Sequence, residues 1–204
     1  MGRSLHTKLA MFLGFLIGSQ LPALAQASPA AIQPLQLSVF GGFTGTDTGL
    51  ASGKSLGLTG GADLRFPPLH GLDPSLEFRG TYAIANDGID SQKSVLGGVK
   101  VAAHFGRLYP YGNFLLGRGE INYGSSGYQV PGRPIFYTQS SSIVLSPGGG
   151  LDLNLSKQFA LKFDLQVQRY TTPVTATGHI YATSGTVGIV YRFDFNHHTK
   201  RSGK

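Results

Sequence analysis

Cysteine and tryptophan are absent from this chain of 204 residues, and only 13% of its residues are charged. The absence of cysteine excludes disulfides, thiolate metal sites and cysteine nucleophiles. Long hydrophobic runs are absent too, because no stretch after residue 25 reaches the roughly eighteen uninterrupted apolar residues that a membrane helix requires. If the chain crosses a membrane, it does so without helices.

Positive charge is scarcer along most of the chain than its net charge of +7 suggests. Arg3 and Lys8 belong to the N-terminal segment, and Lys200, Arg201 and Lys204 lie near the other end. Between these ends the chain contains twelve lysines and arginines and ten acidic residues, so its charge is nearly balanced. No basic patch results, so we do not expect nucleic acid as a partner.

The N-terminus has the order of an export signal. Arg3 and Lys8 accompany an apolar run at 9–17, and Pro22 precedes the small-residue pattern Ala23-Leu24-Ala25. This order predicts a cleavable signal peptide, with an apolar part too short to span a bilayer. We expect cleavage after Ala25, with cleavage after residue 27 as the alternative. The expected segments are a signal peptide at 1–25, a periplasmic linker at 26–34, a main domain at 35–195 and a basic periplasmic tail at 196–204.

Eight later segments alternate apolar and polar residues, the period of a strand with one apolar face. Each supplies the roughly nine to eleven residues of a tilted membrane-crossing strand, and hydrocarbon requires such a sheet to close on itself. In segment 109–123 the run Phe114-Leu115-Leu116 breaks the alternation, which could mark a bulge. The pattern predicts an all-β, eight-stranded antiparallel up-and-down barrel with strands at 35–44, 55–66, 75–83, 93–105, 109–123, 140–155, 159–170 and 184–195.

The face opposite the apolar one carries the charge. Apart from one histidine, six acids and six bases share it. Opposite charges in a narrow barrel are expected to pair, because an unpaired charge away from water is costly. We therefore predict a salt-bridged, mostly occluded lumen that contains Asp63, Arg65, Glu77, Arg79, Lys100, His104, Arg118, Glu120, Asp152, Lys162, Asp164, Arg192 and Asp194.

Connections and aromatic residues indicate which face points inward. A soluble carrier barrel turns its charged face to water, whereas a membrane barrel turns it to the lumen. Short turns at 67–74, 106–107 and 156–158 alternate with longer loops at 45–54, 84–92, 124–139 and 171–183. Aromatics of the apolar face gather at both ends, as bilayer interfaces favour. Toward the turns these are Phe66, Phe105, Tyr109, Phe159, Phe193 and Phe195, and toward the loops Phe43, Tyr82, Tyr123 and Tyr170.

With these features the chain resembles the small outer-membrane β-barrel family that includes the transmembrane domain of OmpA. The resemblance covers 35–195. Its most specific motif is in the last strand, where Thr186, Gly188, Tyr191, Phe193 and Phe195 resemble the family's assembly signal, although residues 196–204 follow it whereas family chains often stop there. The resemblance implies an outer-membrane location with short periplasmic turns and long extracellular loops. It also implies two partners: outer-membrane lipid with lipopolysaccharide, and the outer-membrane assembly machinery.

We expect no catalytic, metal or cofactor site. Acyl transfer needs a histidine beside a nucleophile, with an acid that orients the imidazole. His179, with Thr175, Thr177 and Ser184 nearby, is the single positional candidate, and its loop contains no Asp or Glu. The pair His197-His198 lacks the further ligands of a closed coordination set.

Any specificity is expected in the loops. Tyr128, Phe136, Tyr137 and Tyr181 stand among small polar residues of the two longest loops. Aromatic side chains in that setting suit adhesion or protein binding, and the alternative is that they stack on one another above the membrane. We expect a non-enzymatic structural or surface-interaction barrel with an unknown surface ligand. A small porin-like channel for ions or small solutes is the alternative, and a soluble lipocalin-like carrier the second one.

Overall fold

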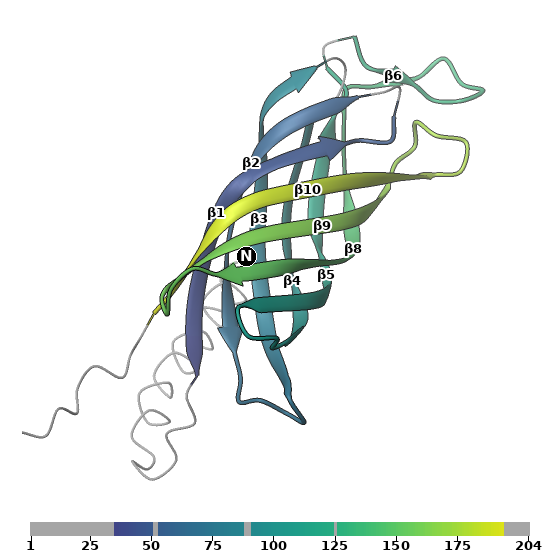
Figure 1. The fold of residues 1–204 in the computed structure, drawn as a ribbon. Coiled ribbons are helices and arrows are strands. Elements are labelled where there is room, and N and C mark those ends of the chain that lie inside the picture. The colour runs from purple at the N-terminus through teal and green to yellow at the C-terminus, as the bar shows by residue number, and fades with distance from the viewer. Residues whose placement is uncertain (1–34, 51–52, 88–90, 125, 194–204) are drawn as a thin grey trace, which may run out of the picture. The chain divides into compact units, whose positions relative to one another are not determined.

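The structure, a computed structural model, describes residues 35–50, 53–87, 91–124 and 126–193. They form a closed antiparallel barrel of eight strands (Figure 1), and a two-stranded hairpin lies in one loop. The signal peptide, linker and basic tail expected from the sequence, together with Asp194 and Phe195, lie outside the described residues. The barrel strands are β1 (Gln36–Asp47), β2 (Lys54–Arg65), β3 (Leu72–Asp87), β4 (Ser91–Ala103), β5 (Leu108–Asn122), β8 (Gln139–Asn154), β9 (Phe159–Thr171) and β10 (His179–Arg192), and the hairpin strands are β6 (Tyr128–Gln129) and β7 (Phe136–Tyr137).

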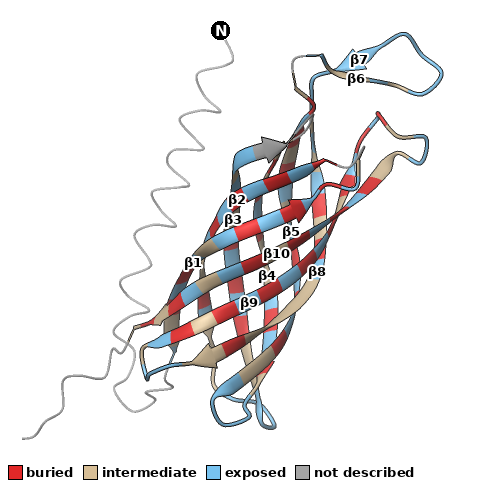
Figure 2. Ribbon diagram, turned by 45° about the horizontal axis from the view of Figure 1, so that its top comes forward, coloured by how far each residue is buried: buried red, intermediate tan, exposed pale blue. Residues whose placement is uncertain are grey.

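The barrel is inside out relative to a soluble protein. Burial alternates along the strands (Figure 2), with polar side chains facing the lumen and large apolar ones facing outward. Phe43 is 62% exposed and Leu165 66%, whereas their neighbours Thr44 and Gln166 are buried. An apolar outer wall around a polar interior is the arrangement of a transmembrane barrel, and it is opposite to that of a lipocalin-like carrier. Across the described ranges, no helix is long and apolar enough to cross a membrane.

Tight turns close one end of the barrel, here called the turn side. Between β2 and β3, Leu69 and Leu72 exchange backbone hydrogen bonds of 2.8 and 3.0 Å around His70 and Gly71. Both central residues have positive φ, 52° and 82°. This is the backbone of a two-residue hairpin turn whose twist matches that of the strands it joins. The positive φ that the turn requires explains the glycine at position 71. A second two-residue turn has Gly106 at its first central position, with φ 64°.

The opposite end, here called the loop side, is partly built from strand. β3 continues to residue 87 and β4 begins at 91, so the expected loop at 84–92 is mostly paired backbone. β10 likewise begins at residue 179, because His179 pairs with Thr171 across the β9 edge. The bulge expected in β5 is wrong: β5 keeps one register with both neighbours, and the register shift lies between β2 and β3 at Leu56/Gly57.

The barrel closes where β10 meets β1, and four residues of the expected assembly signal lie at or near this seam. Thr186 pairs with Thr44, and the two hydroxyls are 2.8 Å apart. A Cβ on Gly188 would collide with the backbone of Gly41 and its neighbour in β1, so glycine permits the close approach. Tyr191 packs edge-on against Phe193 at 5.0 Å between ring centroids. Their role in assembly stays a prediction.

Large lumen side chains are matched by glycines on neighbouring strands. A Cβ on Gly61 would strike the Phe40 ring, and one on Gly150 would strike the Tyr111 phenol and the Phe163 carbonyl oxygen. Interiors of small barrels are filled in this way, by pairing large side chains with small ones. These glycines therefore position the rings around which the polar lumen is organised.

We expect Gly150→Ala to lower the free energy of unfolding by about 1–3 kcal/mol, because the added methyl displaces a buried ring or the neighbouring strand. Urea unfolding of the barrel refolded in lipid vesicles measures this difference. Gly45→Ala is the control, since nothing lies within 4 Å of the position of its Cβ. Equal unfolding midpoints for the two variants would contradict the packing argument.

Candidate functional site: the lumen and its two rims

Arg79 on β3 is the centre of the polar lumen. Its Nε donates to Glu77 Oε1 at 2.7 Å, and its Nη1 and Nη2 donate to the two Asp164 oxygens at 2.7 and 3.1 Å. All three side chains are almost fully buried. Because β3 and β9 lie four strands apart around the barrel, this bidentate contact joins opposite walls across the lumen.

Neutral side chains complete the bonding of the two carboxylates. Asn113 donates to Glu77 at 3.1 Å, and the Tyr111 hydroxyl donates to Asp164 at 2.8 Å. Gln166 Nε2 lies 2.9 Å from the Asn113 side-chain oxygen. A buried charged cluster is stable only when its remaining lone pairs find donors, and these amides and the phenol supply them.

A second charged layer lies nearer the turns. Lys100 Nζ is 3.1 Å from Asp63 and 3.4 Å from Asp152, which come from strands on either side of β4 around the barrel. Lys162 Nζ lies 3.8 Å from Asp152. The two ammonium groups thus share the Asp152 carboxylate. The ion pairs of this layer are therefore weaker than those of the Arg79 layer, in which Arg79 has Glu77 and Asp164 to itself.

Aromatic rings supply part of the electrostatic stabilisation that the shared carboxylate does not give the two lysines. Lys162 Nζ lies 4.4 Å from the Tyr111 ring centroid and 4.5 Å from that of Phe40, and it has no hydrogen-bond acceptor among the described residues. An ammonium between two ring faces is attracted by both quadrupoles. Lys100 adds a third such contact, 4.0 Å above Tyr111.

The loop-side half of the lumen changes from charge to hydroxyls and then to apolar groups. The Thr44 hydroxyl lies 2.5 Å from that of Thr59 and 2.8 Å from that of Thr186. Thr81 extends this row, with its hydroxyl 2.8 Å from that of Thr59. Beyond them the lumen contains a buried apolar cluster, here called the loop-side cluster. It consists of Leu96, Leu115, Ile121, Tyr123, Val144, Tyr170, Val174, Ile180 and Ala182.

Three residues expected in the lumen are outside it, and two of them are on β5. Arg118 and Glu120 project from the outer face of β5, because the strand has no bulge and its lumen positions are instead the odd-numbered ones, Leu115 among them. The apolar residues at 114–116 break the alternation because one of them belongs to the loop-side cluster, not because the strand shifts register.

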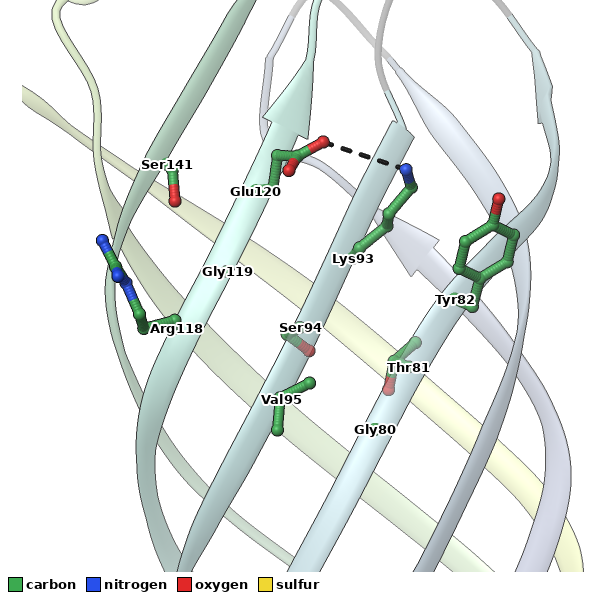
Figure 3. A pocket seen from close by; sticks show the side chains of 10 residues that line it. All are labelled: Gly80, Thr81, Tyr82, Lys93, Ser94, Val95, Arg118, Gly119, Glu120 and Ser141. Atoms are coloured by element: carbon green, nitrogen blue, oxygen red, sulfur yellow. Dashed lines mark ion pairs between the residues drawn. The ribbon is translucent and has the colours of Figure 1, made fainter. Parts of the chain in front are cut away.

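These two side chains line a cavity of about 570 Å³ on the outer wall near the loop side. Figure 3 shows Glu120 and Lys93 pointing toward one another from β5 and β4, with Tyr82 beside them on β3. The Lys93 ammonium is 3.8 Å from Glu120 and 5.1 Å from the Tyr82 ring centroid. Gly80 and Val95 lie below them, while Arg118 lies on the other side of β5 (Figure 3).

His104 also departs from its expected place. It is exposed at the β4–β5 turn, where its ring stacks on Tyr109 at 4.5 Å between centroids and its Nε2 lies 2.8 Å from the Gly106 carbonyl oxygen. Arg65 and Arg192 remain on the lumen side at this turn-side rim. Arg65 lies 3.6 Å from Asp73, and Arg192 donates to Asn154 at 2.5 Å.

The aromatic girdles are thinner than expected, because three of their residues face the lumen. Tyr123 and Tyr170 are fully buried members of the loop-side cluster, and Tyr109 lies at the turn-side rim. Tyr123 bonds the Thr172 hydroxyl, which ties the fourth loop to the cluster. The reason is strand parity. Tyr170 shares the even-numbered lumen positions of β9 with Lys162 and Asp164, and Tyr109 and Tyr123 continue the odd-numbered lumen positions of β5.

The four loop candidates divide between two surroundings. Phe136 and Tyr137 are exposed on the β6–β7 hairpin, whereas Tyr128 is half-buried against Tyr123, with centroids 6.0 Å apart. Tyr181 is exposed, but it lies on the outer face of β10 and not in a loop.

His179 shows no triad-like arrangement with the hydroxyls near it. Its Nε2 lies 2.7 Å from Arg169 Nη2, and the Thr175 and Thr177 hydroxyls donate to its backbone carbonyl oxygen. Within the described ranges, no group of three or more His, Cys, Asp or Glu side chains could hold a metal ion. The pair at 197–198 lies outside those ranges.

Sequence reasoning missed several residues that the lumen depends on. Asp73 falls in a segment expected to be a turn, and Tyr111 carries no charge although it contacts Asp164 and two ammonium groups. Strand parity could have found Tyr111, since it lies two positions from Asn113 on the lumen face of β5. No local signal distinguishes Asp73 from a solvated turn residue.

Comparison with known proteins gives structural matches only. No family model and no curated protein sequence matches this chain. Neisserial surface protein A superposes with a TM-score of 0.50 at 13% identity, over 79% of this chain and 97% of that one. The attachment invasion locus protein Ail of Yersinia pestis, crystallised with the heparin analogue sucrose octasulfate, gives 0.49 at 15% identity, over 78% and 99%. OprG from Pseudomonas aeruginosa gives 0.45 at 12%, over 79% and 97%.

The first of these likenesses, together with the closed eight-stranded barrel, confirms the expected fold class. The chain has the fold of the small outer-membrane β-barrels. At 13% identity this likeness shows the fold alone.

Arg79→Met is expected to lower the free energy of unfolding by about 3–5 kcal/mol, because it leaves two buried carboxylates without their cation. Arg118→Met is the matched control and should change it by less than about 0.5 kcal/mol, since this arginine is exposed on the outer wall. Urea titration of both variants in the same vesicles tests the assignment. If Arg118→Met lowered the free energy of unfolding more than Arg79→Met does, the stabilising arginine would be the one on the outer wall, and the assignment of Arg79 to the lumen network would be contradicted.

Proposed function

We propose that the protein is a non-enzymatic outer-membrane β-barrel with an occluded lumen, and that it acts as a structural or surface-interaction protein. Its barrel fold and apolar outer wall support the location. The observation that carries the proposal is the filling of the lumen along its length. From the turn side to the loop side it contains the lysine layer (Lys100 and Lys162 with Asp63 and Asp152), the Arg79 layer (Arg79 with Glu77 and Asp164) and the loop-side cluster.

Occlusion is supported from both halves. In the turn-side half, the cavity among Asp63, Lys100, Asp152 and Arg192 measures about 10 Å³, which is the space of about one water molecule. In the loop-side half, a hydrated ion would have to displace buried apolar side chains such as Leu96 and Leu115, and apolar constrictions block conduction by excluding water.

The refolded mature protein is expected to be electrically silent in planar lipid bilayers, because neither half offers a continuous aqueous path. Heat-modifiable gel mobility first establishes that the sample is folded. Stable, reproducible openings from folded protein would refute occlusion and favour the porin-like alternative, which otherwise has no specific support.

The outer wall supports lipid with phosphorylated headgroups, lipopolysaccharide included, as a partner. On the loop side the apolar wall ends in outward-facing cations, Lys93, Arg118 and Arg169, with Tyr82 among them. Cations and aromatic residues at this height suit the headgroup region of a leaflet. The cavity between Tyr82 and Arg118 (Figure 3) would receive the start of an acyl chain below a phosphate.

Arg118→Gln is expected to reduce retention of lipopolysaccharide by about fivefold, because each cation near a charged lipid surface contributes about 1 kcal/mol. Native mass spectrometry of protein released from lipopolysaccharide-containing micelles gives the bound fraction. Arg133→Gln, an exposed arginine in the third loop, controls for loss of one charge. Equal retention by both variants would remove the outer-wall site.

The hairpin of β6 and β7 is the candidate surface for a further ligand. Phe136 and Tyr137 are exposed on it, while Tyr128 anchors it to the loop-side cluster. An exposed aromatic pair on an anchored hairpin loses little conformational entropy on binding.

The assembly machinery remains the second proposed partner, through the motif on β10.

A further inference from the structure

The turn-side rim contains a second cavity, of about 480 Å³, whose lining is strongly basic. Here called the rim pocket, it is lined by Arg65, Arg107, Lys157 and Arg192, with Tyr109 and Asn154 between them and no Asp or Glu among its described lining residues. This differs from the lumen below, where each of the two charged layers contains two carboxylates.

Backbone hydrogen bonds hold these cations together although they come from four segments. Asn154 N donates to the Arg107 carbonyl oxygen at 2.9 Å, which ties the end of β8 to the β4–β5 turn. Arg192 N donates to the Gln158 carbonyl oxygen at 2.8 Å, which ties the end of β10 to the β8–β9 turn beside Lys157. The rim pocket is therefore part of the rigid barrel end.

The cations of the rim pocket have little anionic compensation among the described residues. Arg65 reaches Asp73 at 3.6 Å, and Arg192, which is buried, uses Nη1 on a neutral amide while its Nη2 has no acceptor. The Arg65 and Arg192 guanidinium carbons both lie over the Tyr109 ring, at 5.5 and 5.4 Å from its centroid. A ring face attracts cations, but the ring is neutral and does not cancel their charge. The two guanidinium groups therefore still repel one another.

Four convergent cations with free donors, in a cavity of this size, match a polyvalent oxyanion. We propose that the rim pocket binds the phosphate group of a phosphate ester. Guanidinium forks suit phosphate oxygens in bidentate fashion, and Lys157 adds a point charge at the entrance. A volume of about 480 Å³ also leaves room for the organic part of a small ester.

The phosphate has two possible sources, and both present the same chemistry. One is the headgroup of an anionic phospholipid in the turn-side leaflet, since exposed Leu155 on the barrel wall borders the pocket. The other is a soluble phosphate ester on that side of the membrane. The proposal stands whether or not the lumen conducts and does not depend on the proposed surface role.

The test uses the complete mature chain. Binding of glycerol phosphate to protein in dodecyl maltoside, a detergent without phosphate, is followed by calorimetry at low salt. The same titration is repeated in nanodiscs of phosphatidylcholine with and without phosphatidylglycerol. Arg107→Gln/Lys157→Gln removes two exposed turn cations that the fold does not use, and Lys54→Gln/Arg133→Gln removes the same charges from the loop side.

Glycerol phosphate should bind the wild type in detergent, and the turn-side double variant should weaken binding about tenfold or more, as expected for lost charge-assisted hydrogen bonds. The loop-side double variant should bind as the wild type does. If phosphatidylglycerol nanodiscs abolish the soluble binding, the lipid headgroup is the occupant, and if they leave it intact, the soluble ester is. No binding by the folded wild type, or equal loss in both double variants, overturns the proposal.

Discussion

A backbone that crosses hydrocarbon must satisfy every amide and carbonyl internally, and this requirement governs the rest of the structure. Eight strands meet it by closing, with β10 paired to β1 along the seam that Thr44 and Thr186 share. Once the sheet is closed, side chains have only two destinations, lipid or lumen. The exposed outer wall of Phe43 and Leu165 and the buried Arg79 layer are two results of the same closure.

Closure also explains why the lumen is chemically layered. A narrow barrel leaves no bulk water around a charge, so each ion must find a partner across the interior or reach a rim. Arg79 reaches β9 across the barrel, and Lys162 lies between two rings that glycines on neighbouring strands accommodate. Cations without such partners, Arg118 and Arg107 among them, lie on the outer wall or at the ends, where lipid headgroups, solutes and water are available.

Much of this could be predicted from alternation, because a period of two assigns faces wherever one face is uniformly apolar. It placed Asp63, Glu77 and Lys100 on the lumen face, where the structure also has them. It failed in β5, where Leu115 is apolar yet faces inward and Arg118 is charged yet faces outward. Parity along a strand cannot be assigned when the loop-side half of the lumen is itself apolar, since both faces then carry similar residues.

By itself, the sequence determined the number of strands, the inversion of the barrel and most of its charged interior, since these depend on local periodicity and on the cost of polar groups in lipid. The tertiary structure alone decided which ions pair, that Tyr123 fills the lumen, and that four basic residues converge at the turn-side rim. These features depend on contacts between strands far apart in the chain. Register and closure, not local pattern, bring such strands together.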